Sequence, residues 1–214
     1  MKQYHKIQTV FKRDEKTKHI IENEWTLPEF EFLKDNQWVW TEKVDGTNIR
    51  VMWDGENVTF GGKSDDAQMP VFLLYKLQEM FEGTAKRQLF KEIFTYDGVP
   101  ATEVCLYGEG YGAKIQSGGN YIKDGVSFVL FDVKIGDWYL QREAVELIAS
   151  QLGIQVVPIV GQGTLSEAIE KVRAGMNSTW GDFLSEGLVL RPATELKTRR
   201  GDRIITKIKH KDFK

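Results

Sequence analysis

The chain has few of the residues on which disulfide-linked and zinc-binding proteins depend. Its 214 residues include a single cysteine, Cys105, and only three histidines, His5, His19 and His210. One cysteine cannot form an internal disulfide, and its place in the apolar run 104–106 indicates core packing in a reduced compartment rather than a thiol nucleophile. The scattered histidines argue against a zinc site.

Long apolar segments are also missing. No secretory hydrophobic segment opens the chain, and no apolar run reaches 18 residues. We therefore expect a cytoplasmic protein with no membrane partner, located in the host cytoplasm if the chain is of phage origin. A length of 214 residues with 41% hydrophobic and 28% charged residues suits one large domain, alone or with a small appendage.

The chain has little excess of either charge, because its net charge is −2, but its charges are unevenly distributed along the sequence. Residues 1–19 carry six Lys/Arg and two acidic residues, and residues 196–214 carry eight Lys/Arg and two acidic residues. The two ends therefore carry +4 and +6, which leaves −12 for the residues between them. Basic ends on an acidic body suit a protein that meets a polyanion with its ends; ends that merely stay solvated are the alternative.

Strand patterns dominate the sequence, and several follow one another through turns. Alternating or apolar runs predict strands over 37–42, 48–60 with a turn at 54–57, 101–108, 127–133, 186–191 and 203–209. Helical spacing predicts helices over 70–82, 141–152 and 165–174, the last with Thr164 or Ser166 as N-cap. Because turns rather than helices join several strands, the pattern predicts an α+β fold with largely antiparallel sheets.

The most informative stretch begins at Lys43 and continues with Asp45, Gly46 and Asn48, directly after the apolar residues 38–40. It places an amine at a strand end beside a carboxylate and a flexible turn. An ordinary lysine has a pKa of about 10.4, so a lysine nucleophile needs nearby cations or desolvation to lose its proton. A surface lysine beside a turn aspartate is the alternative for so short a motif.

Polar residues recur where strands should be apolar. They are Asn48 and Arg50 after the lysine, Lys63 in the glycine turn 61–64, Glu109 in the glycine-rich run 107–112, the pair Phe131 and Asp132, and Glu186 followed by Lys207 and Lys209. Glycines allow backbone to approach a ligand, a buried aspartate needs a partner, and lysines two apart share one strand face. Taken singly, each patch could equally be a hairpin turn, core packing or a solvated strand face.

Two families of phosphate-binding proteins are excluded. The run 107–112 is similar to a kinase glycine loop, but no strand lysine and no His-Arg-Asp or Asp-Phe-Gly motif follows it. A Walker A loop is also missing from the sequence.

The order of the patches is specific. Lys-x-Asp-Gly, Gly-Glu, Phe-Asp, Glu-Gly-x-Val-x-Arg and Lys-x-Lys, from about Trp38 to Lys209, resemble the covalent nucleotidyltransferase superfamily of ATP-dependent DNA and RNA ligases and capping enzymes. Glu-Lys-Val-Asp-Gly-Thr-Asn and Tyr-Gly-Glu-Gly-Tyr-Gly resemble the RNA ligase 2 family most. The resemblance implies a nucleotidyltransferase (adenylation) domain of antiparallel sheets with flanking helices over 37–214. Residues 1–36 would be a basic leader packed on that core, and a C-terminal OB domain would be missing.

The resemblance also implies a reaction. Lys43 would attack the α-phosphate of ATP to form lysyl-AMP, AMP would pass to a 5′-phosphate end, and a 3′-hydroxyl would displace it, as in RNA repair. The implied roles are phosphate neutralisation by Lys207 and Lys209; metal binding (Mg²⁺ or Mn²⁺) by Glu186 and Glu109; ribose binding by Glu109; adenine binding by Glu42 and Phe131; and phosphate contacts by Asn48, Arg50 and Lys63. Asp45 and Asp132 are carried over with no assigned contact.

The sequence departs from the family at two points. The family usually has an arginine where Lys63 falls, and lysine lacks the bidentate fork, so Arg50 is a second candidate for that role. Classical ligases also continue into a domain that grips nucleic acid. The basic ends or a partner protein would replace it in binding RNA, a nicked duplex or an RNA/DNA hybrid.

Other functions remain open from the sequence. A small ATP-dependent DNA ligase would carry the same motifs, and nicked substrates with RNA or DNA 3′ ends would distinguish it. A capping guanylyltransferase is disfavoured by Glu42 and the Gly-Thr-Asn run. A catalytically inactive nucleic-acid-binding module of the same fold is disfavoured by the intact set of charged motif residues.

Overall fold

The computed structural model describes residues 3–214, so the first two residues of the predicted basic leader lie outside the described residues. Contacts between residues divide the chain into two compact units. Unit 1 contains residues 3–4 and 45–157, and unit 2 contains residues 5–44 and 158–214. Residues 5–36 therefore belong to unit 2. The division into a leader over 1–36 and an adenylation domain over 37–214 stays a prediction.

Unit 1 is built on a six-stranded sheet in the order β11-β10-β9-β5-β6, with β12 pairing with β10. Its strands are β5 (Thr47–Trp53), β6 (Val58–Gly61), β9 (Val104–Gly112), β10 (Val126–Ile135), β11 (Trp138–Tyr139) and β12 (Gln155–Val156), and β7 (Thr95–Tyr96) and β8 (Val99–Pro100) form a separate hairpin. Every pairing except that of β10 with β12 is antiparallel. The predicted hairpin around residues 54–57 is confirmed as β5–β6.

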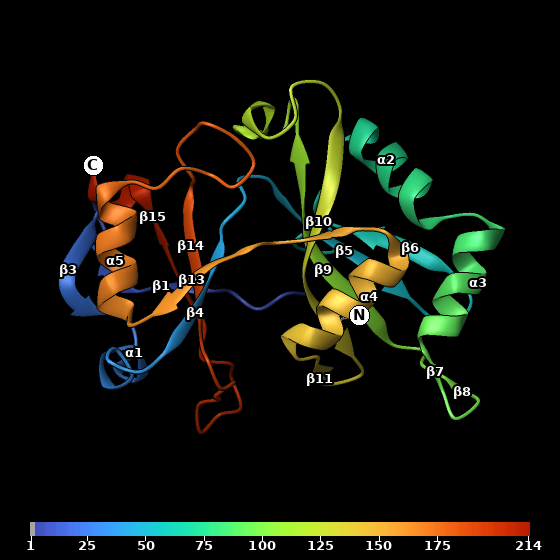
Figure 1. The fold of residues 1–214 in the computed structure, drawn as a ribbon, viewed down its shortest axis with the longest axis horizontal. Coiled ribbons are helices and arrows are strands. Elements are labelled where there is room, and N and C mark those ends of the chain that lie inside the picture. The colour runs from blue at the N-terminus through green and yellow to red at the C-terminus, as the bar shows by residue number, and fades with distance from the viewer. Residues whose placement is uncertain (1–2) are drawn as a thin grey trace. The chain divides into compact units, whose positions relative to one another are not determined.

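The helices of unit 1 are α2 (Val71–Phe81), α3 (Thr84–Ile93) and α4 (Arg142–Leu152), with a short 3₁₀ turn η1 (Gly118–Asn120). Helix α2 buries Leu73, Leu77 and Phe81, which are spaced four residues apart and so share one face. Helices α2 and α4 both pack on β10 (Figure 1). Burying each of these side chains contributes about 1.5–3 kcal/mol of hydrophobic stabilisation.

Unit 2 is built on a five-stranded sheet in the order β1-β15-β14-β4-β13. Its strands are β1 (Gln8–Thr9), β4 (Trp38–Glu42), β13 (Ile159–Gly163), β14 (Gly187–Pro192) and β15 (Thr206–Lys209); β2 (Phe11–Arg13) and β3 (Ile20–Trp25) form a hairpin. Only the β1–β15 pair is parallel. The remaining elements are α1 (Pro28–Phe32), α5 (Leu165–Ala174) and the 3₁₀ turn η2 (His210–Phe213).

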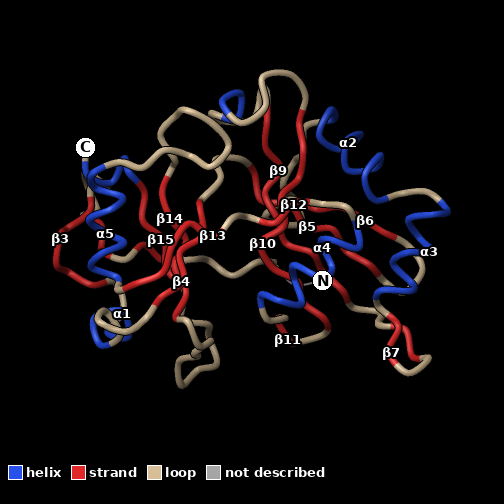
Figure 2. Tube along the Cα trace, in the orientation of Figure 1, coloured by secondary structure: helices blue, strands red, loops and turns tan. Residues whose placement is uncertain are grey.

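Helix α5 contacts β14 and β15, and Figure 2 shows it (blue) alongside the strands of unit 2 (red). Thr164 accepts a hydrogen bond from the Glu167 N–H, and the Glu167 side chain accepts one from the Thr164 N–H. This reciprocal pair satisfies two backbone donors at the helix start and confirms Thr164 as the N-cap. The apolar face of α5 buries Leu165, Ala168, Ile169 and Val172 against the sheet.

The predicted fold class is confirmed. Both units combine helices with mainly antiparallel sheets, and both main sheets are open, so no closed OB barrel lies within residues 3–214. Among these residues no helix combines the length and apolar character that crossing a membrane requires. Cys105 is buried in β9, and burial raises the pKa of its thiol to about 11, which agrees with core packing rather than nucleophilic use.

Candidate active site

Strand pairing in unit 2 brings three motifs of the sequence to one edge of its sheet. Glu42 ends β4, Gly187 begins β14 and Lys209 ends β15. In the register of these neighbouring strands, Leu188 lies opposite Glu42 and Gly187 lies opposite Lys209. The Lys43 N–H also donates to the Gly187 carbonyl at 3.0 Å, which fixes the backbone of Lys43 beside Glu186.

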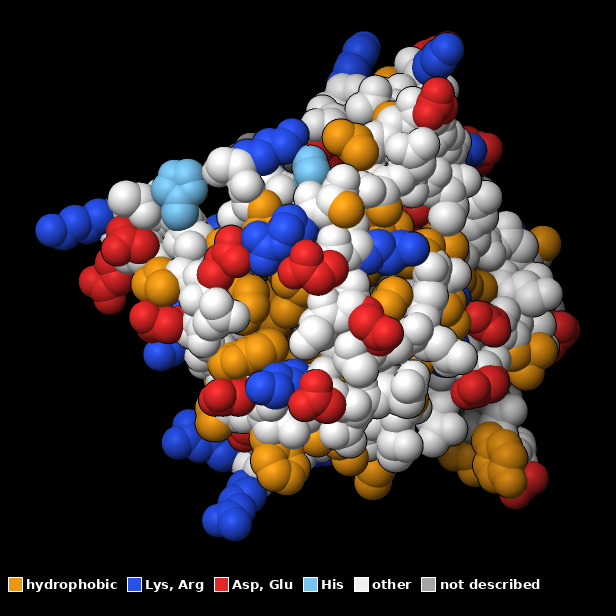
Figure 3. Space-filling view, turned by 60° about the vertical axis from the view of Figure 1, so that its left-hand side comes forward, with side chains coloured by type: hydrophobic (Ala, Val, Ile, Leu, Met, Phe, Trp, Pro, Cys, Tyr) orange, Lys and Arg blue, Asp and Glu red, His pale blue; other side chains and the backbone are white. Residues whose placement is uncertain are grey.

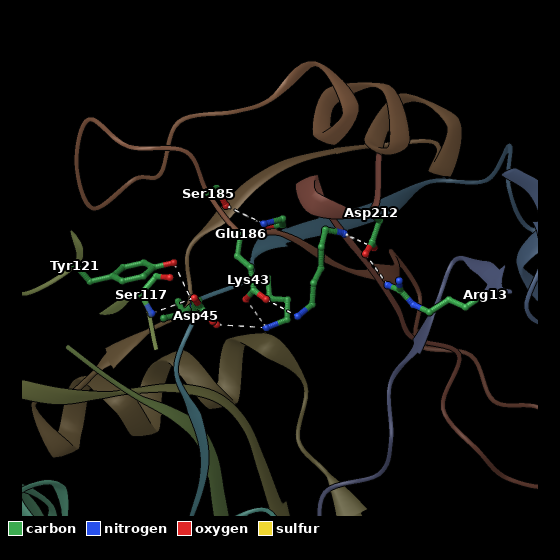
Figure 4. Close-up of polar contacts among 11 residues, drawn as sticks. Arg13, Lys43, Asp45, Ser117, Tyr121, Ser185, Glu186 and Asp212 are labelled. Carbon is green, nitrogen blue, oxygen red and sulfur yellow. Dashed lines mark hydrogen bonds and ion pairs between the residues drawn. The ribbon is translucent and has the colours of Figure 1, made fainter. Parts of the chain in front are cut away.

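One carboxylate bridges two ammonium groups at this edge. Lys43 Nζ lies 2.6 Å from Glu186 Oε2, and Lys209 Nζ lies 2.5 Å from Glu186 Oε1. Figure 4 shows Lys43 and Glu186 pointing toward each other. The three side chains are 18%, 11% and 20% exposed, so they meet one another more than water. The cluster has a net positive charge and suits a phosphate group.

Gly187 allows this arrangement. A Cβ at residue 187 would lie 2.1 Å from the Ile208 carbonyl oxygen and 2.7 Å from Lys209 Cα, closer than packed atoms approach. Any side chain would therefore push β14 away from β15 and separate Glu186 from Lys209. Lys207 shares the half-buried face of β15 with Lys209, because both alternate with the buried Thr206 and Ile208.

Glu42 is almost fully buried, at 1% exposure. Its Oε2 accepts hydrogen bonds from the Thr179 N–H and the Thr179 hydroxyl, each at 2.8 Å. Its Oε1 is buried without a hydrogen-bond partner among the described residues. A buried acceptor left in this way is costly, so Oε1 keeps unused capacity to accept a hydrogen bond.

In unit 1, Asn48 and Glu109 are direct cross-strand neighbours on β5 and β9. Residues opposite one another in an antiparallel pair project from the same face of a sheet, so these two predicted nucleotide-binding residues are side by side. Asn48 Oδ1 is buried without a hydrogen-bond partner among the described residues. A Cβ at Gly46 would lie 2.8 Å from Glu109 Cγ, so the glycine of the lysine motif is needed for this packing.

Asp45 organises the loop that contains η1. Its N–H donates to the Tyr121 hydroxyl at 3.1 Å, and its Oδ2 accepts from the Ser117 N–H at 3.3 Å (Figure 4). The motif aspartate thus fastens a neighbouring loop. Sequence reasoning did not single out Ser117 or Tyr121, because their loop carries no recognised motif.

Arg50 and Lys63 occupy different environments. The Arg50 side chain is 1% exposed, and its guanidinium donates to the Gly62 carbonyl at 2.8 Å and to Asp65 Oδ1 at 2.7 Å. The hydrogen bond from Arg50 holds the pKa of Asp65 below its ordinary value. Lys63, in the same turn, is exposed. Arg50 therefore contacts the turn that carries Lys63, and Lys63 is the more accessible candidate for phosphate.

Phe131 and Asp132 lie at a bulge in β10, where the register with β9 shifts between Leu130 and Asp132. Asp132 is fully buried and accepts a hydrogen bond from the Tyr4 hydroxyl, which confirms that it is paired. The Phe131 ring is partly exposed and packs edge-on against Tyr4, with ring centroids 5.0 Å apart. Tyr4 was not recognised from the sequence, since 128 residues separate it from its partner.

The site residues fit a divalent metal ion that is bound partly by the protein and partly by the phosphates of a nucleotide. No group of three or more His, Cys, Asp or Glu among residues 3–214 is placed to bind an ion by itself. Mg²⁺ and similar ions bind through one or two carboxylates, waters and substrate phosphates, and Glu186 supplies one such carboxylate.

Comparisons with known proteins identify the family and the fold of the chain. A family model described as RNA ligase matches residues 36–209. No match was found among curated proteins. Solved structures of Naegleria gruberi RNA ligase share the fold: a mutant with ATP and Mn (19% identity, TM-score 0.64, 86% of this chain and 54% of that one), an apo mutant (16%, 0.68, 98% and 56%) and a complex with PPi (20%, 0.63, 85% and 52%).

The chain spans little more than half the length of these solved ligases. The family model, by contrast, covers most of the chain, including the lysine motif at residue 43 and the strand lysines at 207 and 209. The chain therefore belongs to the RNA ligase family.

Proposed function

We propose that this protein is an ATP-dependent RNA ligase that joins 5′-phosphate and 3′-hydroxyl ends through a lysyl-AMP intermediate on Lys43. The observation that carries the proposal is the cluster at the sheet edge of unit 2, where Glu186 bridges Lys43 and Lys209. An amine nucleophile beside a second cation is what attack on a nucleotide phosphate requires. The membership of the chain in the RNA ligase family supports the same chemistry.

In the proposed first step, the Lys43 ammonium loses a proton to water, and the resulting amine bonds to the α-phosphorus of ATP as the bond from this phosphorus to the α–β bridging oxygen breaks and pyrophosphate leaves. Lys209, with Lys207, would stabilise the negative charge on the phosphate oxygens. Glu186 would hold Mg²⁺ or Mn²⁺, with Glu109 as a second candidate, and the ion would add to this charge neutralisation. AMP then passes to a 5′-phosphate oxygen, and the 3′-hydroxyl displaces it.

Nucleotide recognition would use the side chains that the sequence motifs assign to base, ribose and phosphate. Glu42 Oε1 would accept from the adenine 6-amino group, and Asn48 Oδ1 and Glu109 would bind the ribose and phosphate region. Phe131 would stack on the base. Lys63 would contact phosphate from its exposed turn, which Arg50 supports.

Incubation with ATP labelled at the α-phosphate and Mg²⁺ or Mn²⁺, followed by denaturing electrophoresis, tests the proposal. We expect an acid-labile covalent label on the protein, which moves to RNA when a 5′-phosphorylated strand is added. Nicked substrates with RNA or DNA 3′ ends then show whether sealing favours RNA. Labelling from the γ-position, or no label from either position, would contradict the proposal.

The segment between β14 and β15 is a candidate contact for the nucleic acid. It forms a closed hairpin, seen as the orange-red loop at the bottom of Figure 1, with Lys197 and Arg203 bridged across it. The Thr198 hydroxyl accepts from the N–H groups of Arg200 and Asp202, each at 3.3 Å, and Glu195 pairs with Arg203 at 2.8 Å. The turn thus presents exposed Arg199 and Arg200 at its tip.

Figure 3 shows a face on which Lys/Arg and Asp/Glu side chains are interspersed. The net charge therefore does not identify a nucleic-acid contact, whereas the basic tip of the hairpin is a specific candidate. In the Arg199→Ala/Arg200→Ala variant we expect the slope of log affinity for RNA against log salt to fall in magnitude by about 1.4–1.8, because two phosphate contacts are lost. Self-labelling by ATP should be unchanged. The matched control is Arg87→Ala/Lys91→Ala, which removes two exposed cations from α3. Equal slopes for both variants would exclude the hairpin as a contact.

A further inference from the structure

The Glu42 carboxylate accepts hydrogen bonds from Thr179 at only one of its two oxygens. Both donors of Thr179 point at Oε2, each at 2.8 Å, whereas Oε1 is buried without a partner among the described residues. Two bonds to a single oxygen fix the rotation of the carboxylate and occupy that oxygen. The free acceptor is therefore always Oε1, and its direction is set by Thr179.

The Thr179 donors are themselves fixed by a closed loop between α5 and β14. Asn177 and Leu184 bridge across this loop, and the Ser178 N–H donates to the Phe183 carbonyl at 2.8 Å. The Ser178 hydroxyl accepts from the Trp180 N–H at 3.1 Å. These bonds on either side of Thr179 hold its backbone N–H and its hydroxyl in place before any ligand arrives.

An oriented carboxylate oxygen distinguishes bases by their hydrogen-bonding groups. A carboxylate offers acceptors and no donor, so its partner must be a donor, which on a purine base is an N–H group. Adenine presents a 6-amino donor, whereas guanine and hypoxanthine present a 6-oxo acceptor that would face Oε1 with like charge. A buried polar group that is left unpaired is a strong basis for rejecting the wrong substrate.

We propose that Thr179 is a positioning residue that sets the preference of this enzyme for adenine nucleotides by directing Glu42 Oε1 at the base. The inference rests on the proposed function and adds a residue that acts through Glu42. Thr179 lies in a polar loop seven residues before Glu186 and belongs to none of the sequence motifs considered.

The first test measures self-labelling rates with ATP, GTP, ITP and the triphosphate of purine riboside, which lacks the 6-amino group. For Thr179→Val we expect kcat/KM with ATP to fall about 10- to 100-fold, mainly through KM, while the rates with the other three change little. Thr179→Ser keeps both donors and should restore the preference to within about threefold of wild type. Thr41→Val is the matched control, because the Thr41 hydroxyl donates to the Val189 carbonyl at 3.2 Å and not to Glu42. The nucleotide preference of this variant should be that of wild type.

The second test uses Glu42→Gln, whose side chain has one acceptor and one donor. With Thr179 present, the amide oxygen must face the two Thr179 donors, so the NH₂ group faces the base and should raise the rate with ITP relative to ATP at least about tenfold. In the double variant Glu42→Gln/Thr179→Val only the backbone N–H of residue 179 still holds the amide oxygen, so the amide turns over more readily and this gain should shrink at least about threefold. A merely structural role for Thr179 would not produce this dependence.

The outcomes separate the two proposals. If wild type takes up no label from any nucleotide, the proposed function fails. If wild type labels well with ATP but Thr179→Val slows all four nucleotides equally, or Glu42→Gln gives the same ITP/ATP ratio with and without Thr179, the ligase assignment stands and the role of Thr179 is overturned. Thermal melting of Thr179→Val beside Thr41→Val checks the fold, and the Thr179→Ser and Glu42→Gln results decide the matter if Thr179→Val does not fold.

Discussion

Lys43→Ala should take up no label from α-labelled ATP, a loss of at least about 1000-fold, because it lacks the nitrogen to which AMP is attached. Lys43→Arg should lose labelling to the same degree. It keeps the positive charge and a partner for Glu186, but a guanidinium stays protonated and cannot attack phosphorus. Denaturing electrophoresis of both variants beside wild type measures this directly.

Lys43→Ala and Lys43→Arg together distinguish a nucleophilic role of Lys43 from a role as the ion-pair partner of Glu186. If the role of Lys43 were only to pair with Glu186 at 2.6 Å, arginine would replace it and labelling would persist. Lys171→Ala removes an exposed cation from α5 and should label as wild type does. RNA that already carries AMP at its 5′ end bypasses the first step, so Lys43→Ala should still seal it. Loss of that sealing as well would point to a general defect rather than to the missing nucleophile.

The parts of the fold that follow local rules were predictable. The apolar spacing of Leu73, Leu77 and Phe81 gave α2, and Thr164, one of the two predicted N-caps, marks the start of α5. Helix α3 was not predicted because it is mostly polar and charged, and Phe90 is its only buried residue. The strands before residue 37 are two to six residues long and bury only Phe11 fully, so they too lack a clear pattern.

The candidate site was predictable where residues lie within motifs. The alternation of Thr206, Lys207, Ile208 and Lys209 placed both lysines on one strand face before the strand pairing was known. The bridge from Glu186 to Lys43 spans 143 residues and depends on the register of β4, β14 and β15. Thr179 lies 137 residues from Glu42 in a loop without a motif, so only the folded chain reveals their contact.

Glu186→Ala should lower self-labelling by about 100- to 1000-fold, the second-largest effect expected. Its carboxylate is the only one within ion-pair distance of Lys43 among the contacts of residues 3–214, and it also holds Lys209. Without it the two ammonium groups would repel and separate, and the carboxylate proposed to hold the divalent ion would be missing. Labelling rates measured across a range of Mg²⁺ and Mn²⁺ concentrations separate these two contributions.

If Glu186 holds the ion, Glu186→Gln should need a much higher metal concentration for half-maximal labelling, and Glu186→Asp should recover part of the difference. Were the carboxylate needed only as a partner for the lysines, Glu186→Gln would change the maximal rate and leave the metal dependence as in wild type. Glu195→Gln is the matched control, because Glu195 also pairs with a cation of unit 2, Arg203, at 2.8 Å, in the hairpin between β14 and β15. Its metal dependence should match that of wild type, so a shift found only at residue 186 would assign the ion to this carboxylate.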